Sequence, residues 1–315
     1  MNPYWGKDFL GFFFTLFERV FLFMTGRGDA LFSDELQLLI LGMLSLSCGL
    51  IGAFLLLRKM SMLANSLSHT VLLGIVITCI LFRFADIDMQ SIDLKILMGA
   101  ALISALLTAG LTELFTKLLR LQEDASIGLV FTGLFSLGVI LVTLYTSNSH
   151  IGPESVMGNV DALHISDLKS IFFILMLNVA AVALFYRQFQ ITSFDPVLAK
   201  TLGISVTFFH YLLLFLCSAT VIGAFRAVGV ILVLAFLVGP FLTARLLSHK
   251  LKHILFLSPL LGISASLIGV ALSRHFLSVF NMPLSTGSIV VLTIAAQFVA
   301  VLTYKSLRKS KLIKA

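Results

Sequence analysis

The segment Ser193-Phe194-Asp195-Pro196-Val197-Leu198-Ala199-Lys200-Thr201-Leu202-Gly203 leads into two long apolar runs. Asp195 suits the N-cap position, because its carboxylate can accept hydrogen bonds from the free amides of a first helical turn. Pro196 suits the first helical position, and Gly203 suits the residue just past the last one. The pattern predicts a helix of about seven residues over 196–202, which is too short to be stable alone. We therefore expect this helix to rest on other protein, and a partner on the cytosolic side is the natural candidate.

The composition of the chain is that of an integral membrane protein. Of its 315 residues 59% are hydrophobic and only 12% are charged, whereas soluble proteins carry roughly 25% charged residues. Apolar runs of about 20 residues are typical of transmembrane helices. The sequence thus predicts an all-α, polytopic fold surrounded by lipid. The net charge of +7 lies mainly in short loops and the C-terminal tail, and we expect no nucleic-acid partner.

Apolar runs predict about eight to nine transmembrane helices. They cover residues 36–57, 62–82, 95–118, 125–147, 168–188, 204–223, 227–248, 254–274 and 285–304. Between the sixth and seventh runs stands a very short connection at Arg226, which predicts a tight hairpin turn there. We divide the chain into an N-terminal interfacial segment, 1–35, a transmembrane domain, 36–305, and a basic cytosolic tail, 306–315.

Basic residues mark one side of the membrane. Alternate short loops are rich in Lys and Arg, and such loops stay in the cytosol. The basic loops hold Arg58, Lys59, Lys117, Arg120, Arg187, Lys200, Arg245, Lys250 and Lys252. The tail is then cytosolic, and the loops 83–94, 148–167, 224–226 and 275–284 are outside. Acidic residues in the outer loops either attract cations or simply reflect the avoidance of Lys and Arg there.

Residues 9–23 form a shorter apolar run that is rich in phenylalanine. Glu18 and Arg19 fall in its middle, where each charge would cost a spanning helix roughly 2.5–3.5 kcal/mol. An aromatic helix that lies in the membrane interface fits this pattern better. Whether residues 9–24 cross the membrane is left open by the sequence.

Small residues predict where helices touch. Ser45, Gly49 and Ala53 lie four apart on the first run, and Ala105 and Ala109 do so on the third. Such spacing allows close backbone approach in a membrane, where hydrophobicity does not drive helix association.

Polar residues inside or beside the apolar runs are the candidate functional groups. Asn65 and His69 are four apart, so they share a helix face, and a neutral imidazole is a good ligand for Mn, Fe or Zn. The alternative is a histidine that hydrogen-bonds a neighbouring helix. Glu123 and Asp124 precede the fourth run, where they either cap a helix N-terminus or contact a cytosolic partner.

Nucleotide-binding motifs are absent from the sequence. The chain has no GxxxxGK[ST] phosphate loop and no HExxH or GxSxG motif, each of which carries a specific chemistry. We expect no enzymatic activity in this chain and no cofactor of its own. If ATP drives this protein, another subunit binds the nucleotide.

Several segments together resemble one family. They are Leu57-Arg58-Lys59-Met60 followed by Ser66-Leu67-Ser68-His69 and Gly74, then Glu123-Asp124-Ala125-Ser126-Ile127-Gly128, then Ser193-Phe194-Asp195-Pro196 with Leu202-Gly203, His210-Tyr211, Ala227-Val228-Gly229 and Thr243-Ala244-Arg245-Leu246-Leu247, and finally Leu284-Ser285-Thr286-Gly287-Ser288. In order and spacing they are similar to the permease subunits of the ABC-3 family, the membrane component of bacterial manganese, zinc and iron importers. The similarity covers nearly everything after residue 36.

The resemblance implies a type II-like importer in the bacterial inner membrane that works by alternating access. The cargo would be a divalent Mn, Zn or Fe ion. The chain would pair with a second permease subunit, identical or not. Two cytosolic ATPases would bind ATP below it, and an extracytoplasmic metal-binding protein would dock above it.

Two groups of residues correspond to functional positions of that family. The coupling segment to the ATPase would be Asp195, Pro196, Ala199, Leu202 and Gly203. His69 matches a family histidine that meets the metal in the pathway. Asn65, however, stands where the family has Asp, and Leu73 stands where it has Pro, so this subunit would offer a weaker ligand set.

Other functions are compatible with many membrane spans. A permease for iron chelates or cobalamin would need a wide, aromatic-lined path, and an ion-driven secondary carrier would work without an ATPase. An intramembrane enzyme would need a nucleophile and a base within the helices. Ser68 and His69 are adjacent and so point to different helix faces, which disfavours a catalytic dyad of these two.

Overall fold

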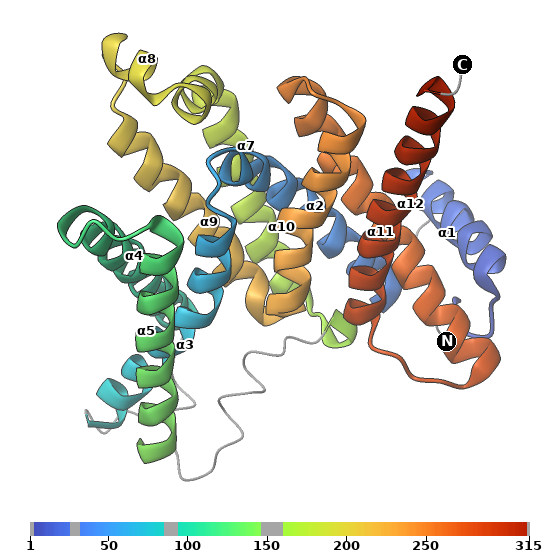
Figure 1. Ribbon diagram of the computed structural model, residues 1–315. Helices are drawn as coiled ribbons and strands as arrows, with labels where there is room; N and C mark the ends of the chain where they lie inside the picture. Colours follow the sequence, from blue (N-terminus) through green and yellow to red (C-terminus); the bar gives the residue numbers. More distant parts are fainter. Residues whose placement is uncertain (1–2, 26–31, 85–93, 146–159, 314–315) are drawn as a thin grey trace. The chain divides into compact units, whose positions relative to one another are not determined.

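Helices make up nearly all of the described chain. The computed structural model describes residues 3–25, 32–84, 94–145 and 160–313, some of them by their backbone alone (Figure 1). The helices are α1 (Phe9–Met24), α2 (Ser33–Leu57), α3 (Ser61–Phe84), α4 (Leu94–Leu118), α5 (Glu123–Tyr145), η2 (Val160–Ala162), α7 (Ile165–Phe194), α8 (Pro196–Thr201), α9 (Val206–Val228), α10 (Val230–Leu247), α11 (Leu251–Phe280) and α12 (Thr286–Ile313). In these four ranges there is no β-strand.

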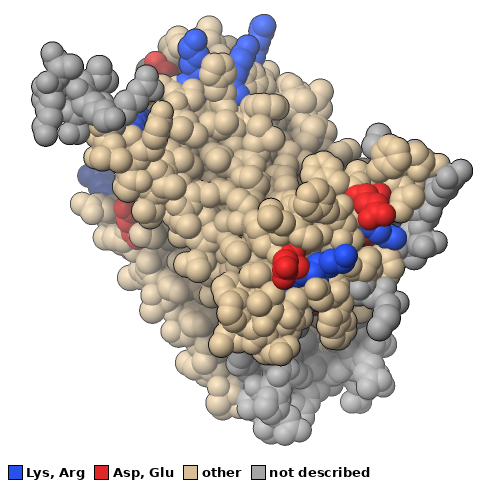
Figure 2. All heavy atoms as spheres, turned by 90° about the vertical axis from the view of Figure 1, so that its right-hand side faces the viewer, with Lys and Arg blue, Asp and Glu red and all other residues tan. Residues whose placement is uncertain are grey.

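Each predicted span coincides with one long helix, so the all-α polytopic prediction is confirmed. Within the described residues, seven helices are long and apolar enough to cross a membrane, namely α2, α5, α7 and α9 to α12. The remaining two predicted spans are α3 and α4, of 24 and 25 residues. On the face drawn in Figure 2, uncharged residues dominate and charged side chains lie in small groups. Such a surface suits contact with lipid.

Several helix ends differ from those that the sequence predicts: α11 continues to Phe280 and α12 to Ile313, and two further differences concern the turn after α9 and the end of α7. The turn between the sixth and seventh spans is not at Arg226, which lies inside α9, but at Gly229, whose φ of 84° only glycine adopts readily. α7 also continues past residue 188 to Phe194, with non-helical dihedrals at Phe185. The helix can run that far because Asp195 Nα still donates to Ile191 O (2.8 Å), and Pro196 then begins a new helix.

The described chain divides into two compact units. Unit 1 contains Met1–Ala53, Asn159–Leu175 and Ile231–Ala315, and unit 2 contains Phe54–Gly158 and Met176–Val230. Helices α2 and α7 each contribute residues to both units. The candidate site residues all fall in unit 2.

In unit 1 the small residues of α2 allow close helix packing. A Cβ added at Gly49 would lie 2.9 Å from Pro259 Cγ, and one added at Gly52 would clash with the carbonyl of Leu237. Ser45 Oγ donates to Pro259 O (2.9 Å). The prediction that Ser45, Gly49 and Ala53 face other helices is confirmed, since all three are buried.

α1 forms a separate helix of 16 residues in unit 1. Arg19 pairs with Glu35 (2.7 Å) and stacks over the Phe32 ring, while Tyr4 Oη donates to Glu35 Oε1 (3.0 Å). Burial beside this carboxylate raises the pKa of Tyr4. α1 exposes the aromatic side chains Phe14, Phe17, Phe21 and Phe23, and Trp5, which precedes the helix, is exposed as well. Such a face fits the predicted interfacial position, which stays a prediction.

In unit 2, α3 packs against α4 and α5 (Figure 1). Gly74 of α3 meets the backbone of α4 directly, since an added Cβ would lie 2.5 Å from Ala100 O. Ser104 Oγ donates to Thr70 O (2.6 Å), and Thr108 Oγ1 donates to Thr70 Oγ1 (2.8 Å). Hydroxyl bonds of this kind hold helices together where no water competes. Ala105 and Ala109 are buried, as their spacing predicts.

Candidate functional site

The short helix α8 has the capping that its sequence predicts. Asp195 Oδ1 accepts hydrogen bonds from Val197 N (3.1 Å) and Leu198 N (2.9 Å), and Pro196 occupies the first turn. The helix ends at Thr201, one residue earlier than predicted, because Leu202 is its C-cap. These bonds satisfy amides that a helix of this length would otherwise leave unpaired.

The end of α8 is closed by backbone hydrogen bonds. Gly203 has a φ of 76°, Gly203 N donates to Lys200 O (3.1 Å), and Ile204 N donates to Ala199 O (2.9 Å). This is the Schellman arrangement, which needs a left-handed residue and therefore favours glycine. Both ends of α8 are thus held by the residues that the sequence singles out.

α8 buries one side and exposes the other. Ala199 is fully buried and α8 packs on α9, so the chain itself supplies part of the support that a short helix needs, and the cytosolic partner stays a prediction. The apolar residues around it are exposed, namely Phe194, Val197, Leu198 and Leu202. Exposed apolar residues on a rigid helix make a suitable contact surface for another protein.

Arg58 joins the turn after α2 to the last turn of α7. Arg58 Nε donates to Ser193 Oγ (3.1 Å), and a terminal nitrogen of the same side chain donates to Thr192 Oγ1 (2.6 Å). Burial lowers the pKa of Arg58 to about 10, so the guanidinium is charged at neutral pH. Among the described residues no carboxylate forms an ion pair with it. In the sequence this residue marks a basic loop and belongs to one of the family-like segments, and neither feature predicts its contacts with α7.

Asn65 and His69 lie on α3, one turn apart, and both are half-buried. The imidazole of His69 contacts the rings of Phe131 and Phe135 of α5, with centroid distances of 5.4 and 5.7 Å. Those two rings are stacked on each other at 5.8 Å. The arrangement fixes the direction of the imidazole by aromatic packing. Leu73, at the position of the family proline, is buried and contacts Gly138 of α5.

Asn65 and His69 offer one amide oxygen and one imidazole nitrogen as possible ligands. No group of three or more His, Cys, Asp or Glu side chains that could hold a metal ion occurs in the described part of the chain. Closed metal sites usually have four ligands. On α3 the chain therefore presents two donors on one helix face rather than a complete set.

α5 begins at Glu123, two residues before the predicted span, so the acidic pair lies in its first turn rather than ahead of it. Asp124 is exposed in the first turn. The side chain of Glu123 lies outside the described residues. Both the capping role and the contact with a partner stay predictions for this pair.

Polar contacts in unit 2 join the end of α4 to the start of α9. Glu113, near the end of α4, accepts hydrogen bonds from Lys117 and from Tyr211, which lies near the start of α9. The end of α4 and the start of α9 therefore lie together, as the alternation of basic loops requires. Which face of the membrane they occupy stays a prediction.

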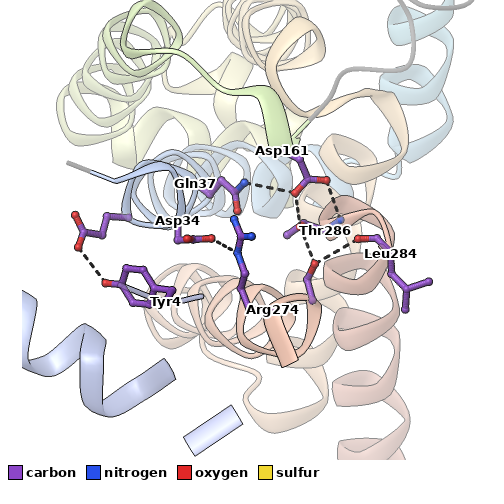
Figure 3. A network of polar contacts seen from close by, with 9 residues as sticks. Tyr4, Asp34, Gln37, Asp161, Arg274, Leu284 and Thr286 are labelled. Carbon is purple, nitrogen blue, oxygen red and sulfur yellow. Dashed lines mark hydrogen bonds and ion pairs between the residues drawn. The ribbon is translucent and has the colours of Figure 1, made fainter. Parts of the chain in front are cut away.

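A second polar network, in unit 1, was not singled out as functional by the sequence. Buried Asp34 pairs with Arg274, Gln37 Nε2 donates to Asp161 Oδ1 (3.4 Å), and Asp161 Oδ1 accepts from Thr286 Oγ1 (2.5 Å) (Figure 3). We call these five residues the acidic network. It brings together the start of α2, η2, the end of α11 and the start of α12. The topology predicts that these four ends share one side, and this grouping is confirmed.

With this geometry described, comparison with known proteins identifies the family. The profile of the ABC 3 transport family matches residues 36–305. The chain belongs to this family. A protein of Chlamydia muridarum named "Probable metal transport system membrane protein" is 36% identical over 317 residues, which cover 100% of this chain and 98% of that protein. The manganese transport system membrane protein MntD of Bacillus subtilis is 39% identical over 240 residues, covering 72% of this chain and 79% of that protein.

A solved structure agrees with the ABC 3 assignment. PsaBC from Streptococcus pneumoniae in complex with Fab matches with a TM-score of 0.70 and 30% identity, over 86% of this chain and 91% of that chain. The family resemblance drawn from the motifs is therefore confirmed. Together with the apolar helices, it makes the chain a multi-pass membrane permease subunit of the ABC transporter class.

Proposed function

We propose that this ABC 3 permease subunit imports a divalent transition metal, with ATP hydrolysed by a separate cytosolic ATPase dimer. The observation that carries the proposal is α8. It is a short helix capped at both ends, with a buried Ala199 and exposed Val197, Leu198 and Leu202. A rigid apolar projection of this kind suits a groove on another protein, and movement of that protein would be passed to α7 and α9 at its two ends.

Manganese is the favoured cargo among Mn, Zn and Fe. Relatives from Bacillus subtilis and from Listeria innocua are named manganese transport system membrane proteins. Imidazole and amide oxygen are acceptable donors for Mn²⁺. Two donors on α3 would bind an ion weakly, which suits a pathway that the ion must leave again. The missing ligands would come from a second permease subunit or from water.

The other partners follow from the same proposal. A second permease subunit would complete the pathway, and an extracytoplasmic metal-binding protein would deliver the ion. The chain would lie in the bacterial inner membrane with its C-terminus in the cytosol. Glu123 and Asp124, at the start of α5 on the proposed cytosolic side, would be further candidates for contact with the ATPase.

Transport of radiolabelled ions tests the proposal. The permease would be reconstituted into proteoliposomes with its partner subunits, and uptake of Mn²⁺, Zn²⁺ and Fe²⁺ would be measured with and without ATP. ATP-dependent accumulation of Mn²⁺ is the expected result. Accumulation without ATP would point to an ion-driven carrier, and no uptake of any free ion would favour a chelate permease. Either outcome would refute the proposal.

The role of His69 is tested in the same system. His69→Ala removes the imidazole donor, so we expect Mn²⁺ uptake to fall by about tenfold or more, as for loss of a group that holds the transported ion. The matched control is Phe131→Leu, which disturbs the packing beside the imidazole but keeps the donor. Unchanged uptake by a normally assembled His69→Ala complex would exclude His69 from the pathway.

A further inference from the structure

We propose that Arg58 is a positioning residue that transmits movement of α8 to the start of α3. This inference rests on the proposed function, because it concerns how the coupling helix acts on the helix that carries Asn65 and His69. Arg58 stands between the two. Its side chain bonds the end of α7, and its backbone belongs to the turn that leads into α3.

On one side, Arg58 is joined closely to α8. Its guanidinium donates to Thr192 Oγ1 (2.6 Å) and Ser193 Oγ (3.1 Å), in the final turn of α7. Asp195, the N-cap of α8, follows two residues later and is itself bonded to Ile191 O (2.8 Å). No flexible linker separates the acceptors of Arg58 from α8. A shift of α8 must therefore move these two hydroxyls.

On the other side, Arg58 is joined rigidly to α3. Lys59 N donates to Leu56 O and Met60 N donates to Leu55 O, each at 3.1 Å, and Lys59 has a φ of 61°. These bonds form a Schellman motif that fixes the turn. Met60 is buried, and α3 begins at the next residue, Ser61. His69 lies about two turns further along the same helix.

The chemistry of the contact favours a moving part over a purely structural one. Arg58 is partly buried, and partial burial of a guanidinium costs desolvation energy that a carboxylate partner would normally offset. Arg58 instead bonds two neutral hydroxyls, and no described carboxylate pairs with it. The planar guanidinium holds both acceptors in a fixed geometry, whereas a lysine ammonium is a point charge on a flexible stem. A movement of these two hydroxyls would therefore change both the position and the orientation of the guanidinium.

A second contact joins the end of α2 to the end of α7, and it could hold the two helix ends together without Arg58. The ring of Phe54 in α2 packs on Phe189 in α7, with centroids 5.4 Å apart, and both side chains are fully buried. This packing alone would keep the helix ends together without Arg58. A test of Arg58 must therefore separate assembly from transmission.

Metal uptake per ATP hydrolysed provides that separation. In proteoliposomes with the ATPase partner, Arg58→Gln is expected to lower the number of Mn²⁺ ions imported per ATP by about tenfold, in the range for residues that carry coupling between sites. ATP hydrolysis itself should change by less than about twofold, since Phe54 and Phe189 still hold the helix ends. The matched control is Lys59→Gln, which removes the neighbouring exposed charge and should leave the ratio unchanged.

A second variant shows whether the effect of Arg58→Gln comes from loss of this contact or from misfolding. Thr192→Val with Ser193→Ala removes both acceptors while Arg58 stays in place, and it should lower the same ratio by about threefold or more. Adding Arg58→Gln to this double variant should have no further effect beyond that of Arg58→Gln alone, because the residues act through one contact. Full additivity, or an unchanged ratio in both variants, would refute the inference.

Amide hydrogen exchange gives a direct readout of the movement. In the wild-type complex, ATP binding should change exchange in residues 196–204 and in residues 58–64 together. In the Arg58→Gln complex only the first segment should respond. If wild-type complexes show no ATP-driven Mn²⁺ uptake, the proposed function fails; if they transport normally and Arg58→Gln retains both responses, only the role of Arg58 fails.

Discussion

Arg58 and Arg274 are both partly enclosed by protein, yet their surroundings differ. Arg274 pairs with the buried carboxylate of Asp34, within a network that also holds Gln37, Asp161 and Thr286 (Figure 3). Arg58 bonds the hydroxyls of Thr192 and Ser193, and in the described part of the chain no carboxylate pairs with it. The charge of Arg274 is neutralised by Asp34, so removing Arg274 leaves a negative charge behind. The charge of Arg58 is not neutralised by these hydroxyls, so removing Arg58 leaves no negative charge behind.

This difference separates two uses of a charged side chain. In the acidic network, complementary charges and capping bonds tie four helix ends of unit 1 into one arrangement. At Arg58 the contact is specific in geometry but does not neutralise the charge. We infer that the acidic network serves stability, whereas Arg58 serves transmission, and the same substitution at both positions can test this.

The largest expected effect is that of Arg274→Met. The substitution takes the Arg274 cation away from the carboxylate of Asp34, whose side chain is 0% exposed. We expect the free energy of unfolding to fall by about 3 kcal/mol, the low end for breaking a buried pair, because Arg274 is partly exposed. Thermal unfolding of the purified permease in detergent would measure this.

A double variant checks the cause of that loss. Arg274→Met with Asp34→Asn removes both charges, so it should recover a large part of the lost stability. If the double variant loses as much free energy of unfolding as the two single variants together, Arg274 does not act by charge compensation. The proposed difference between Arg274 and Arg58 would then be wrong.

An intermediate effect is expected for Asp195→Ala in unit 2. The substitution removes the acceptor for Val197 N and Leu198 N, which should destabilise α8 by about 0.5–2 kcal/mol. Because α8 is short and lies at the edge of unit 2, we expect ATP-driven uptake to fall while the unfolding temperature of the whole permease changes little. Uptake and unfolding would be measured on the same preparation.

The control for Asp195 keeps the cap but alters its charge. Asp195→Ser can still accept a hydrogen bond from the first turn, so it should retain most of the uptake. Equal loss in the Ser and Ala variants would show that the charge of Asp195, and not the cap, is needed.

The smallest expected change in stability is that of Arg58→Met. Arg58 is partly buried and has no carboxylate partner among the described residues, and replacing such an ion with an apolar side chain is often neutral, so we expect a change within about 1 kcal/mol. The uptake of Mn²⁺ per ATP should nevertheless fall as in Arg58→Gln. A loss of stability as large as that of Arg274→Met would instead assign Arg58 a structural role.

Much of this protein follows from local sequence. The apolar runs predict the nine long helices, because a lipid-embedded chain must satisfy its backbone hydrogen bonds within each span. Asp195, Pro196 and Gly203 predict α8, because capping depends on residues close in sequence. Ser45 and Gly49 predict a helix contact, because only small side chains allow backbones so close.

Other features were decided only by the tertiary structure. Burial of Ala199 against α9 depends on a neighbouring helix, so no local pattern could indicate which side of α8 is covered. The pairs Asp34–Arg274 and Arg58–Ser193 join residues more than about a hundred positions apart, and charge alone does not choose a partner over such a distance. The junction at Gly229 lay three residues from the predicted turn, because Arg226 can be accommodated within a helix whereas a φ of 84° strongly favours glycine.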